Sequence, residues 1–168
     1  MQGFGRKVSD AGFRTQGLRV MSDRPIAIAS DHAGYRLKQL LAEELKSLDL
    51  EVVDLGTADG ETSVDYPDFA ESLAEAVRDG RAARGVLVCG TGLGISIAAN
   101  RHPWIRAAVC HDETTARLCR EHNDANVLVL GARIVGEEVA KGCLKAFLGT
   151  PFAGGRHERR VNKLGPKA

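Results

Sequence analysis

Residues 85–96 have the sequence GVLVCGTGLGIS, and the order of residue types in this segment indicates how the chain is organised. The first five residues, which end at Cys89, form an uninterrupted apolar run of the kind found in parallel strands covered on both faces. Three closely spaced glycines then provide a tight turn, and the apolar residues beyond them suit the start of a helix. The segment therefore predicts a strand, a glycine turn and a helix, which is the repeating unit of a parallel α/β sheet.

The alternation of apolar runs and helical patterns continues on both sides of this segment. Four further short apolar runs predict strands at residues 26–29, 52–55, 107–110 and 127–130. Apolar residues at helical spacing predict helices at residues 35–48, from Pro67 to about Val77, at 114–121 and at 137–148. We therefore predict the α/β class, as a three-layer α/β/α sandwich around a five-stranded parallel, Rossmann-like sheet.

The length of 168 residues fits a single domain, which we place at residues 25–168 with a basic C-terminal tail from Gly154 onward. Residues 1–24 are expected to be a leader or an upstream extension outside the fold. They are basic and contain no apolar run of the roughly 7–15 residues that a secretory signal needs, and Met21 offers a second start.

The composition is that of an ordinary globular protein, with 43% hydrophobic and 27% charged residues. A formal net charge of +1 gives no overall attraction to nucleic acid or to anionic lipid, and no apolar run approaches the ~20 residues of a membrane span. The four cysteines form no C-x-x-C pair, which argues against a zinc site, and unpaired thiols favour a reduced cytoplasmic compartment. We expect no nucleic-acid partner, no membrane association and no metal.

Ligands of open parallel sheets bind beyond the carboxyl ends of the strands, so the loops after the strands are the place to look for a site. The glycine turn after Cys89 aims backbone N–H groups at one point, which favours an anion or a developing oxyanion. A thiol beside such a point can accept a proton if its pKa is lowered toward neutrality. The same features could also merely close a βα unit around a small buried side chain.

A nucleotide site fits this turn poorly. The dinucleotide fingerprint G-x-G-x-x-G requires glycine where this chain has Ile95, and it follows the first strand of a unit, whereas this turn follows the third. No Gly-Lys-Ser or Gly-Lys-Thr sequence is present, so a P-loop is not predicted.

Five motifs, in order between about Pro25 and Val161, resemble a known family. They are SDHAG at residues 30–34, DYP at 65–67, CGTGLGISIAAN at 89–100, EHNDAN at 121–126 and GGRH at 154–157. They look like the motifs of ribose-5-phosphate isomerase B, within the wider ribose/galactose isomerase family of sugar-phosphate isomerases. That family also includes the subunits of galactose-6-phosphate isomerase and allose-6-phosphate isomerase.

The resemblance implies a role for each matching residue. Cys89 corresponds to the base that moves a proton between C2 and C1 of the open-chain sugar, and His122, assisted by Asp31 and Thr91, to the group that opens the furanose ring. A second set stabilises the enediolate oxygens: Thr91, Asn123 and the amides of Gly90, Gly92 and Gly94. A third set binds the substrate: His32, Arg133, Arg156 and Arg160 at the phosphate, and Tyr66 along the sugar.

Several of these residues also have a purely structural interpretation. Asp31 could cap the first helix, and His122 could offset a helix dipole. Arg156 and Arg160 could belong to a solvated tail, although their four-residue spacing also suits two guanidinium groups that close on one phosphate.

The resemblance thus implies a cytoplasmic aldose–ketose isomerase that interconverts D-ribose 5-phosphate and D-ribulose 5-phosphate through an enediolate, without metal or other cofactor. It also implies a homodimer, or a dimer of dimers, with active sites at the subunit interface, so that some of the arginines come from the partner chain. Two alternatives stay open. The substrate could be allose 6-phosphate, galactose 6-phosphate or erythrose 4-phosphate, or the chain could be a non-catalytic phosphosugar-binding module.

Overall fold

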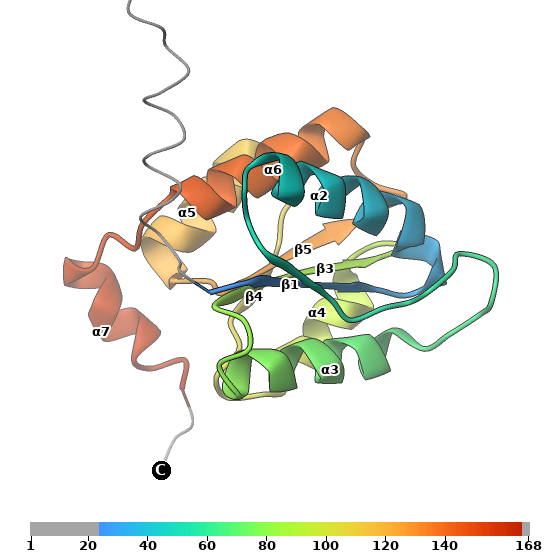
Figure 1. Ribbon diagram of the computed structural model, residues 1–168. Helices are drawn as coiled ribbons and strands as arrows, with labels where there is room; N and C mark the ends of the chain where they lie inside the picture. Colours follow the sequence, from blue (N-terminus) through green and yellow to red (C-terminus); the bar gives the residue numbers. More distant parts are fainter. Residues whose placement is uncertain (1–23, 166–168) are drawn as a thin grey trace, which may run out of the picture.

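The computed structural model describes residues 24–165, so the extension predicted for residues 1–24 lies, apart from Arg24, outside the described residues. The described chain forms a five-stranded parallel sheet with the strand order β2-β1-β3-β5-β4 (Figure 1). The strands are β1 (Ile26–Ser30), β2 (Val52–Asp54), β3 (Arg84–Cys89), β4 (Ala107–Val109) and β5 (Val127–Gly131). The helices are η1 (His32–Gly34), α2 (Tyr35–Ser47), α3 (Tyr66–Arg78), α4 (Leu93–Ala99), α5 (Glu113–Asn123), α6 (Glu137–Gly149), η2 (Gly155–His157) and α7 (Glu158–Val161).

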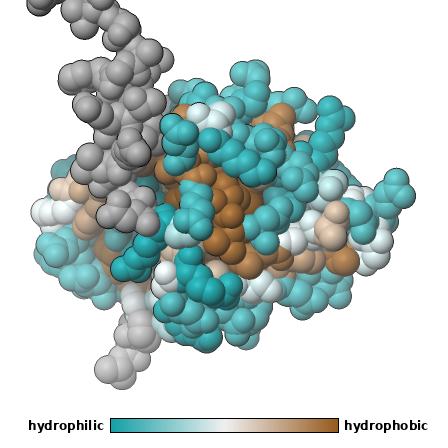
Figure 2. All heavy atoms as spheres, viewed as in Figure 1, coloured by the Kyte–Doolittle hydropathy of each residue, from teal (hydrophilic) through white to brown (hydrophobic). Residues whose placement is uncertain are grey.

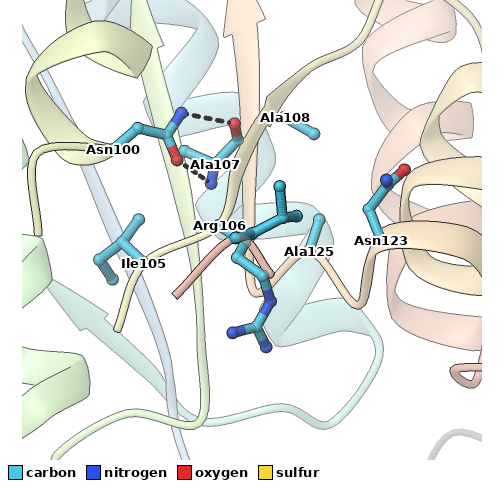
Figure 3. A pocket seen from close by; sticks show the side chains of 8 residues that line it. Asn100, Ile105, Arg106, Ala107, Ala108, Asn123 and Ala125 are labelled. Carbon is cyan, nitrogen blue, oxygen red and sulfur yellow. Dashed lines mark hydrogen bonds between the residues drawn. The ribbon is translucent and has the colours of Figure 1, made fainter. Parts of the chain in front are cut away.

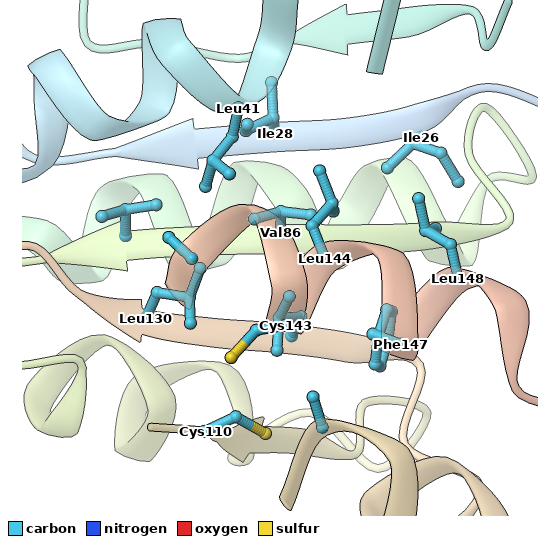
Figure 4. Close-up of a cluster of buried hydrophobic side chains, with 14 of the residues drawn as sticks. Ile26, Ile28, Leu41, Val86, Cys110, Leu130, Cys143, Leu144, Phe147 and Leu148 are labelled. Carbon is cyan, nitrogen blue, oxygen red and sulfur yellow. The ribbon is translucent and has the colours of Figure 1, made fainter. Parts of the chain in front are cut away.

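Helices cover both faces of the sheet, which confirms the predicted three-layer α/β/α sandwich (Figure 1). Ile26 and Ile28 of β1 pack into the layer of α2, α5 and α6, whereas Ala27 and Ala29 pack into the layer of α3 and α4. This alternation is the two-residue period of a strand with both faces buried. Figure 4 shows the first layer, where Phe147 and Leu144 of α6 meet the strands.

Two parts of the chain differ from the sequence-based expectation. Helix α5 continues to Asn123, two residues beyond the predicted end, so that His122 lies within its last turn. The C-terminal tail, as far as residue 165, contributes no side chain to either core cluster, but it is not a fully solvated segment. It forms η2 and α7, and the side chain of His157 is buried.

The strand order creates one point where the chain winding reverses, between β1 and β3. After β1 the chain runs outward to β2, and it then crosses back to β3 on the other side of β1. Ser30 pairs with Val88 in register, so the loops that follow β1 and β3 begin side by side and then diverge. A crevice for a ligand is expected at such a point.

An ion pair between a buried lysine and an exposed aspartate anchors the chain where it leaves β2. The ammonium group of Lys38 on α2, which is 1% exposed, lies 2.6 Å from both carboxylate oxygens of Asp54 at the end of β2. Asp54 also accepts a hydrogen bond from the N–H of Gly56. The pair therefore holds the start of the segment that leads from β2 to α3. Figure 2 shows apolar residues gathered at the middle of the face turned to the viewer. Val52 and Val53 of β2 are half-buried.

We predict that Lys38→Ala lowers the free energy of unfolding by about 2 kcal/mol. The substitution removes the buried aliphatic part of the lysine side chain and leaves the carboxylate of Asp54 without its ion-pair partner. Lys46→Ala is the matched control on the same helix, since Lys46 pairs with Glu43 at 2.7 Å but is 60% exposed. Its cost should stay below about 0.5 kcal/mol. Urea unfolding of both variants checks the prediction, and equal costs would contradict it.

Candidate active site

Cys89 is the last residue of β3, and its thiol is 4% exposed at the carboxyl edge of the sheet. The chain turns back over the sulfur, and the N–H of Gly92 donates to Cys89 Sγ at 3.1 Å. Gly92 has a φ of 81°, in the left-handed region, and a Cβ there would lie 3.2 Å from the carbonyl carbon of Leu130. Glycine is therefore required at this position to bring the donor to the sulfur. A backbone N–H aimed at sulfur helps to stabilise negative charge there.

Asp31 and His32 lie beside this turn. The N–H of Asp31 donates to the carbonyl of Val88, which ties the loop after β1 to β3. Asp31 Oδ1 accepts from the N–H of Gly34, so the predicted capping role is present, on the short helix η1. His32 Nδ1 accepts from the N–H of Val64 at 3.2 Å. The ring nitrogen that remains to donate in the neutral form is therefore Nε2.

The loop after β5 completes the group at the carboxyl edge. Cys89 pairs with Gly131, and the N–H groups of Ala132 and Arg133 donate to the carbonyls of Cys89 and Gly90. The guanidinium group of Arg133 lies 3.6 Å from the position that a Cβ on Gly90 would take. A positive charge is thus held next to the glycine turn. Tyr66, at the start of α3, packs on Gly94 from the opposite side.

The remaining predicted site residues lie elsewhere. His122 and Asn123 end α5, and Arg156 and Arg160 belong to η2 and α7, which pack against α5. The rings of His122 and His157 stack with centroids 4.3 Å apart and an interplanar angle of 7°. His157 is the last residue of the GGRH motif, and no sequence pattern pointed to a role for its side chain. The ring of His157 joins the C-terminal segment to His122.

Asn123 also lines a pocket of about 350 Å³ together with Asn100, Arg106 and Leu164 (Figure 3). Two asparagines of the quoted motifs turn out to be structural at this edge. Asn100 exchanges hydrogen bonds with both backbone groups of Ala107, and Asn126 accepts from the N–H of Arg106. They fix the entry into β4.

The described chain therefore carries two separate groups of site residues. Asn126 accepts from the N–H of Gly85 near the beginning of β3, whereas Cys89 ends that strand. A six-residue strand is roughly 17 Å long, so the two groups lie at opposite edges of the sheet, as Figure 1 shows for α7 and the end of β1. Within the described chain, His122 therefore lies at the opposite edge of the sheet from Asp31 and Thr91.

Comparison with known proteins identifies the family to which this chain belongs. The family model described as Ribose/Galactose Isomerase matches residues 26–164, which is nearly all of the described chain. The chain belongs to the ribose/galactose isomerase family. The ribose/galactose isomerase assignment confirms the predicted family and its class of enzyme, a sugar-phosphate isomerase.

Individual relatives agree with this assignment. The chain is 46% identical over 141 residues to ribose-5-phosphate isomerase B of Escherichia coli strain K12, and the match covers 84% of this chain and 94% of the relative. It is 43% identical to D-erythrulose-4-phosphate isomerase of Pectobacterium atrosepticum, covering 83% and 92%. Among solved structures, ribose-5-phosphate isomerase B of Clostridium thermocellum is 55% identical with a TM-score of 0.82, covering 84% and 95%.

Two further findings bear on the sequence analysis. No helix among residues 24–165 is long and apolar enough to cross a membrane. Within the same range, no group of three or more His, Cys, Asp or Glu side chains is arranged to hold a metal ion.

The stacked histidines give a prediction about pH. Burial lowers the pKa of His157 below its usual value near 6.5, and the positive charges of His122, Arg156 and Arg160 lower the pKa further, against a smaller opposite effect of Glu121. The unfolded segment then binds more protons than the docked one between the two pKa values. Docking of residues 155–161 on α5 is therefore fully stable above pH 6.5 and weakens as the pH falls through the lower value.

Hydrogen exchange of the amides of residues 155–161, corrected for intrinsic rates, should show severalfold weaker protection at pH 5.5 than at pH 7.5. His157→Gln should remove most of this difference, because glutamine does not titrate. An unchanged pH dependence in that variant would assign the effect to another group.

Proposed function

We propose that this chain interconverts D-ribose 5-phosphate and D-ribulose 5-phosphate as a homodimer, without metal or other cofactor. The observation that carries the proposal is the position of the Cys89 thiol, which accepts a hydrogen bond from the N–H of Gly92 at the carboxyl edge of the sheet. The adjoining loops carry Asp31, His32 and Arg133. A base and nearby donors are what an enediolate route requires. The name of the Escherichia coli relative and of the Clostridium thermocellum structure supports ribose 5-phosphate as the substrate.

The proton transfer follows from this arrangement. The thiolate of Cys89 takes the proton from C2 of the open-chain aldose, and the electrons of the C–H bond move into a C1–C2 double bond as the carbonyl oxygen becomes an enediolate oxygen. The amides of Gly90, Gly92 and Gly94 and the hydroxyl of Thr91 stabilise that oxygen. The thiol then returns a proton to C1 while the proton of the C2 hydroxyl passes to the C1 oxygen, so that C2 becomes the carbonyl carbon of the ketose and the thiolate is regenerated. His32, through Nε2–H, and Arg133 bind the phosphate, and Tyr66 lines the sugar.

The second group of residues completes the site from a partner chain. In this proposal His122 opens the furanose ring, Asn123 adds a donor to the enediolate, and Arg156 and Arg160 bind the phosphate. Exposed apolar side chains flank both groups: Leu93 and Ile97 on α4 are 58% and 69% exposed, and Leu164 beyond α7 is 62% exposed. Large apolar residues left to solvent beside polar site residues are typical of a surface that another subunit covers.

A four-carbon substrate is the alternative that a specific observation favours. The Pectobacterium atrosepticum relative is named D-erythrulose-4-phosphate isomerase and matches this chain almost as well as the Escherichia coli relative does. A non-catalytic phosphosugar-binding module is less consistent with the site. Such a module would need cations for the phosphate, but it would not need a buried thiol with a backbone donor aimed at its sulfur.

Turnover of a panel of four-, five- and six-carbon aldose phosphates tests the substrate. We expect ribose 5-phosphate to have the highest kcat/KM, with activity retained in EDTA and with solvent deuterium incorporated at the transferred position. Cys89→Ala should abolish this exchange while phosphate-ligand binding stays within a few-fold. A higher kcat/KM with erythrose 4-phosphate would show that the substrate is the four-carbon sugar and not ribose 5-phosphate. Residual deuterium exchange in Cys89→Ala would assign the base to another residue.

Mixing two inactive variants tests whether the site is shared. Cys89→Ala and His122→Ala remove residues from different edges, so a mixed dimer has one intact site and one site with both defects. Random re-association after unfolding should restore roughly a quarter of wild-type activity, because half of the dimers are mixed. The control mixture is Cys89→Ala with Asp31→Ala. Both residues lie at the same edge of one chain, so every site in a mixed dimer keeps one defect and no activity should be restored. Equal recovery in both mixtures, or none in either, would contradict a shared site.

A further inference from the structure

Tyr66 and Gly94 form a contact that the proposed chemistry does not explain. A Cβ built on Gly94 would lie 2.6 Å from Tyr66 Cζ and 2.9 Å from Tyr66 Oη. Atoms do not approach so closely, so the ring of Tyr66, which is 39% exposed, would have to move to admit any side chain at position 94. The two residues belong to α3 and α4, which lie side by side on one face of the sheet (Figure 1).

The backbone of Gly94 gives no reason for a glycine. Gly92 has a positive φ, but Gly94 lies inside α4 and is not among the positive-φ glycines of residues 24–165. Alanine is the better helix former at such a position. Alanine would also keep the N–H that the enediolate proposal uses. The feature that distinguishes glycine here is therefore the room it leaves for the ring of Tyr66.

Tyr66 directly follows the segment 57–65, which connects β2 with α3. The segment is attached at its start, where Thr57 is buried and its N–H donates to the carbonyl of Ser30 at 2.8 Å. Val64, near the end of this segment, donates its N–H to His32 Nδ1. Tyr66 follows directly and rests on Gly94. Residues 58–63 between these attachments and β2 are exposed. The segment is thus held by Ser30 at its start, and by the contacts of Val64 with His32 and of Tyr66 with Gly94 at its end.

We propose that Gly94 is a positioning residue that seats Tyr66, and with it the segment 57–65, and thereby sets the length of sugar phosphate that the site accepts. The inference rests on the proposed isomerase function and deepens it. In this role the missing side chain of Gly94 acts through Tyr66, whereas the N–H of Gly94, which the enediolate proposal uses, is retained in an alanine variant. Gly94→Ala should therefore affect the fit of the sugar more than proton transfer at Cys89.

A double-mutant cycle of Gly94→Ala and Tyr66→Ala tests the contact. In the wild-type background, Gly94→Ala should raise KM for the preferred aldose phosphate by roughly ten- to a hundredfold, with a smaller change in kcat. In the Tyr66→Ala background, the same change should alter kcat/KM by less than about twofold, because the clash is gone. Tyr66→Phe retains the ring, so Gly94→Ala should remain costly there.

Chain-length selectivity is the readout that a merely structural role would not move. The ratio of kcat/KM for four-, five- and six-carbon aldose phosphates should shift in the same direction in Gly94→Ala and in Tyr66→Ala. An unchanged ratio in Gly94→Ala, or an equal cost of Gly94→Ala in both backgrounds, would overturn the inference. Gly92→Ala is the matched control, because its strain lies in the backbone and its cost should be the same with and without Tyr66.

Thermal unfolding separates this inference from the proposed function, because it needs no substrate. Gly94→Ala should lower Tm in the presence of Tyr66 and raise it slightly in the Tyr66→Ala background, where only the better helix propensity of alanine remains. If wild-type protein turned over no aldose phosphate, the proposed function would fail while this reversal of sign could still be observed. If the enzyme converts the aldose phosphates but the change in Tm caused by Gly94→Ala has the same sign in both backgrounds, the positioning role of Gly94 is wrong and the proposed function is unaffected.

Discussion

The parallel pairing of β1, β3 and β5 is the constraint on which the site depends. Ser30 lies opposite Val88, and Cys89 lies opposite Gly131, so three loops leave the sheet at adjacent points of one edge. The same rule sends every connecting helix back to the other edge, because each parallel strand must begin there. The end of α5 is therefore about one strand length from the thiol. One topological constraint thus brings Asp31, Cys89 and Arg133 together and places His122 and Asn123 at the opposite edge.

The sequence predicted the fold well because the central strands are buried on both faces. Continuous apolar runs located β1, β3 and β5 to within one residue, whereas the edge strands β2 and β4 are shorter than expected. Helix α5 was the least accurate prediction. Its last turn is polar, and its start is set by Asp112, whose side chain accepts from the N–H of Thr115. Apolar periodicity detects neither feature, since both are hydrogen-bonding effects at the ends of a helix.

The motifs identified the family and the residues near Cys89, but they did not show which residues share an edge. The signal was nevertheless present in the sequence. His122 and Asn123 come just before an apolar run, and a residue that precedes a parallel strand lies at the opposite edge from one that follows it. Other features required coordinates. The stack of His157 on His122 and the N–H of Val64 at His32 join segments that are far apart in sequence and carry no pattern.

The two glycines of the turn show why chemistry and selectivity can change separately in this fold. Gly92 is required by its backbone conformation and brings a donor to the thiol, so a side chain there would disturb the part of the site that all aldose phosphates share. Gly94 leaves room for Tyr66, which directly follows the segment 57–65, and the middle of that segment is exposed and contributes nothing to either core layer. Exposed connections of this kind tolerate substitutions far better than buried strands do. Relatives of similar overall identity that bear the names of four-carbon and five-carbon isomerases are therefore expected to differ around this segment, while the thiol and its turn stay in place.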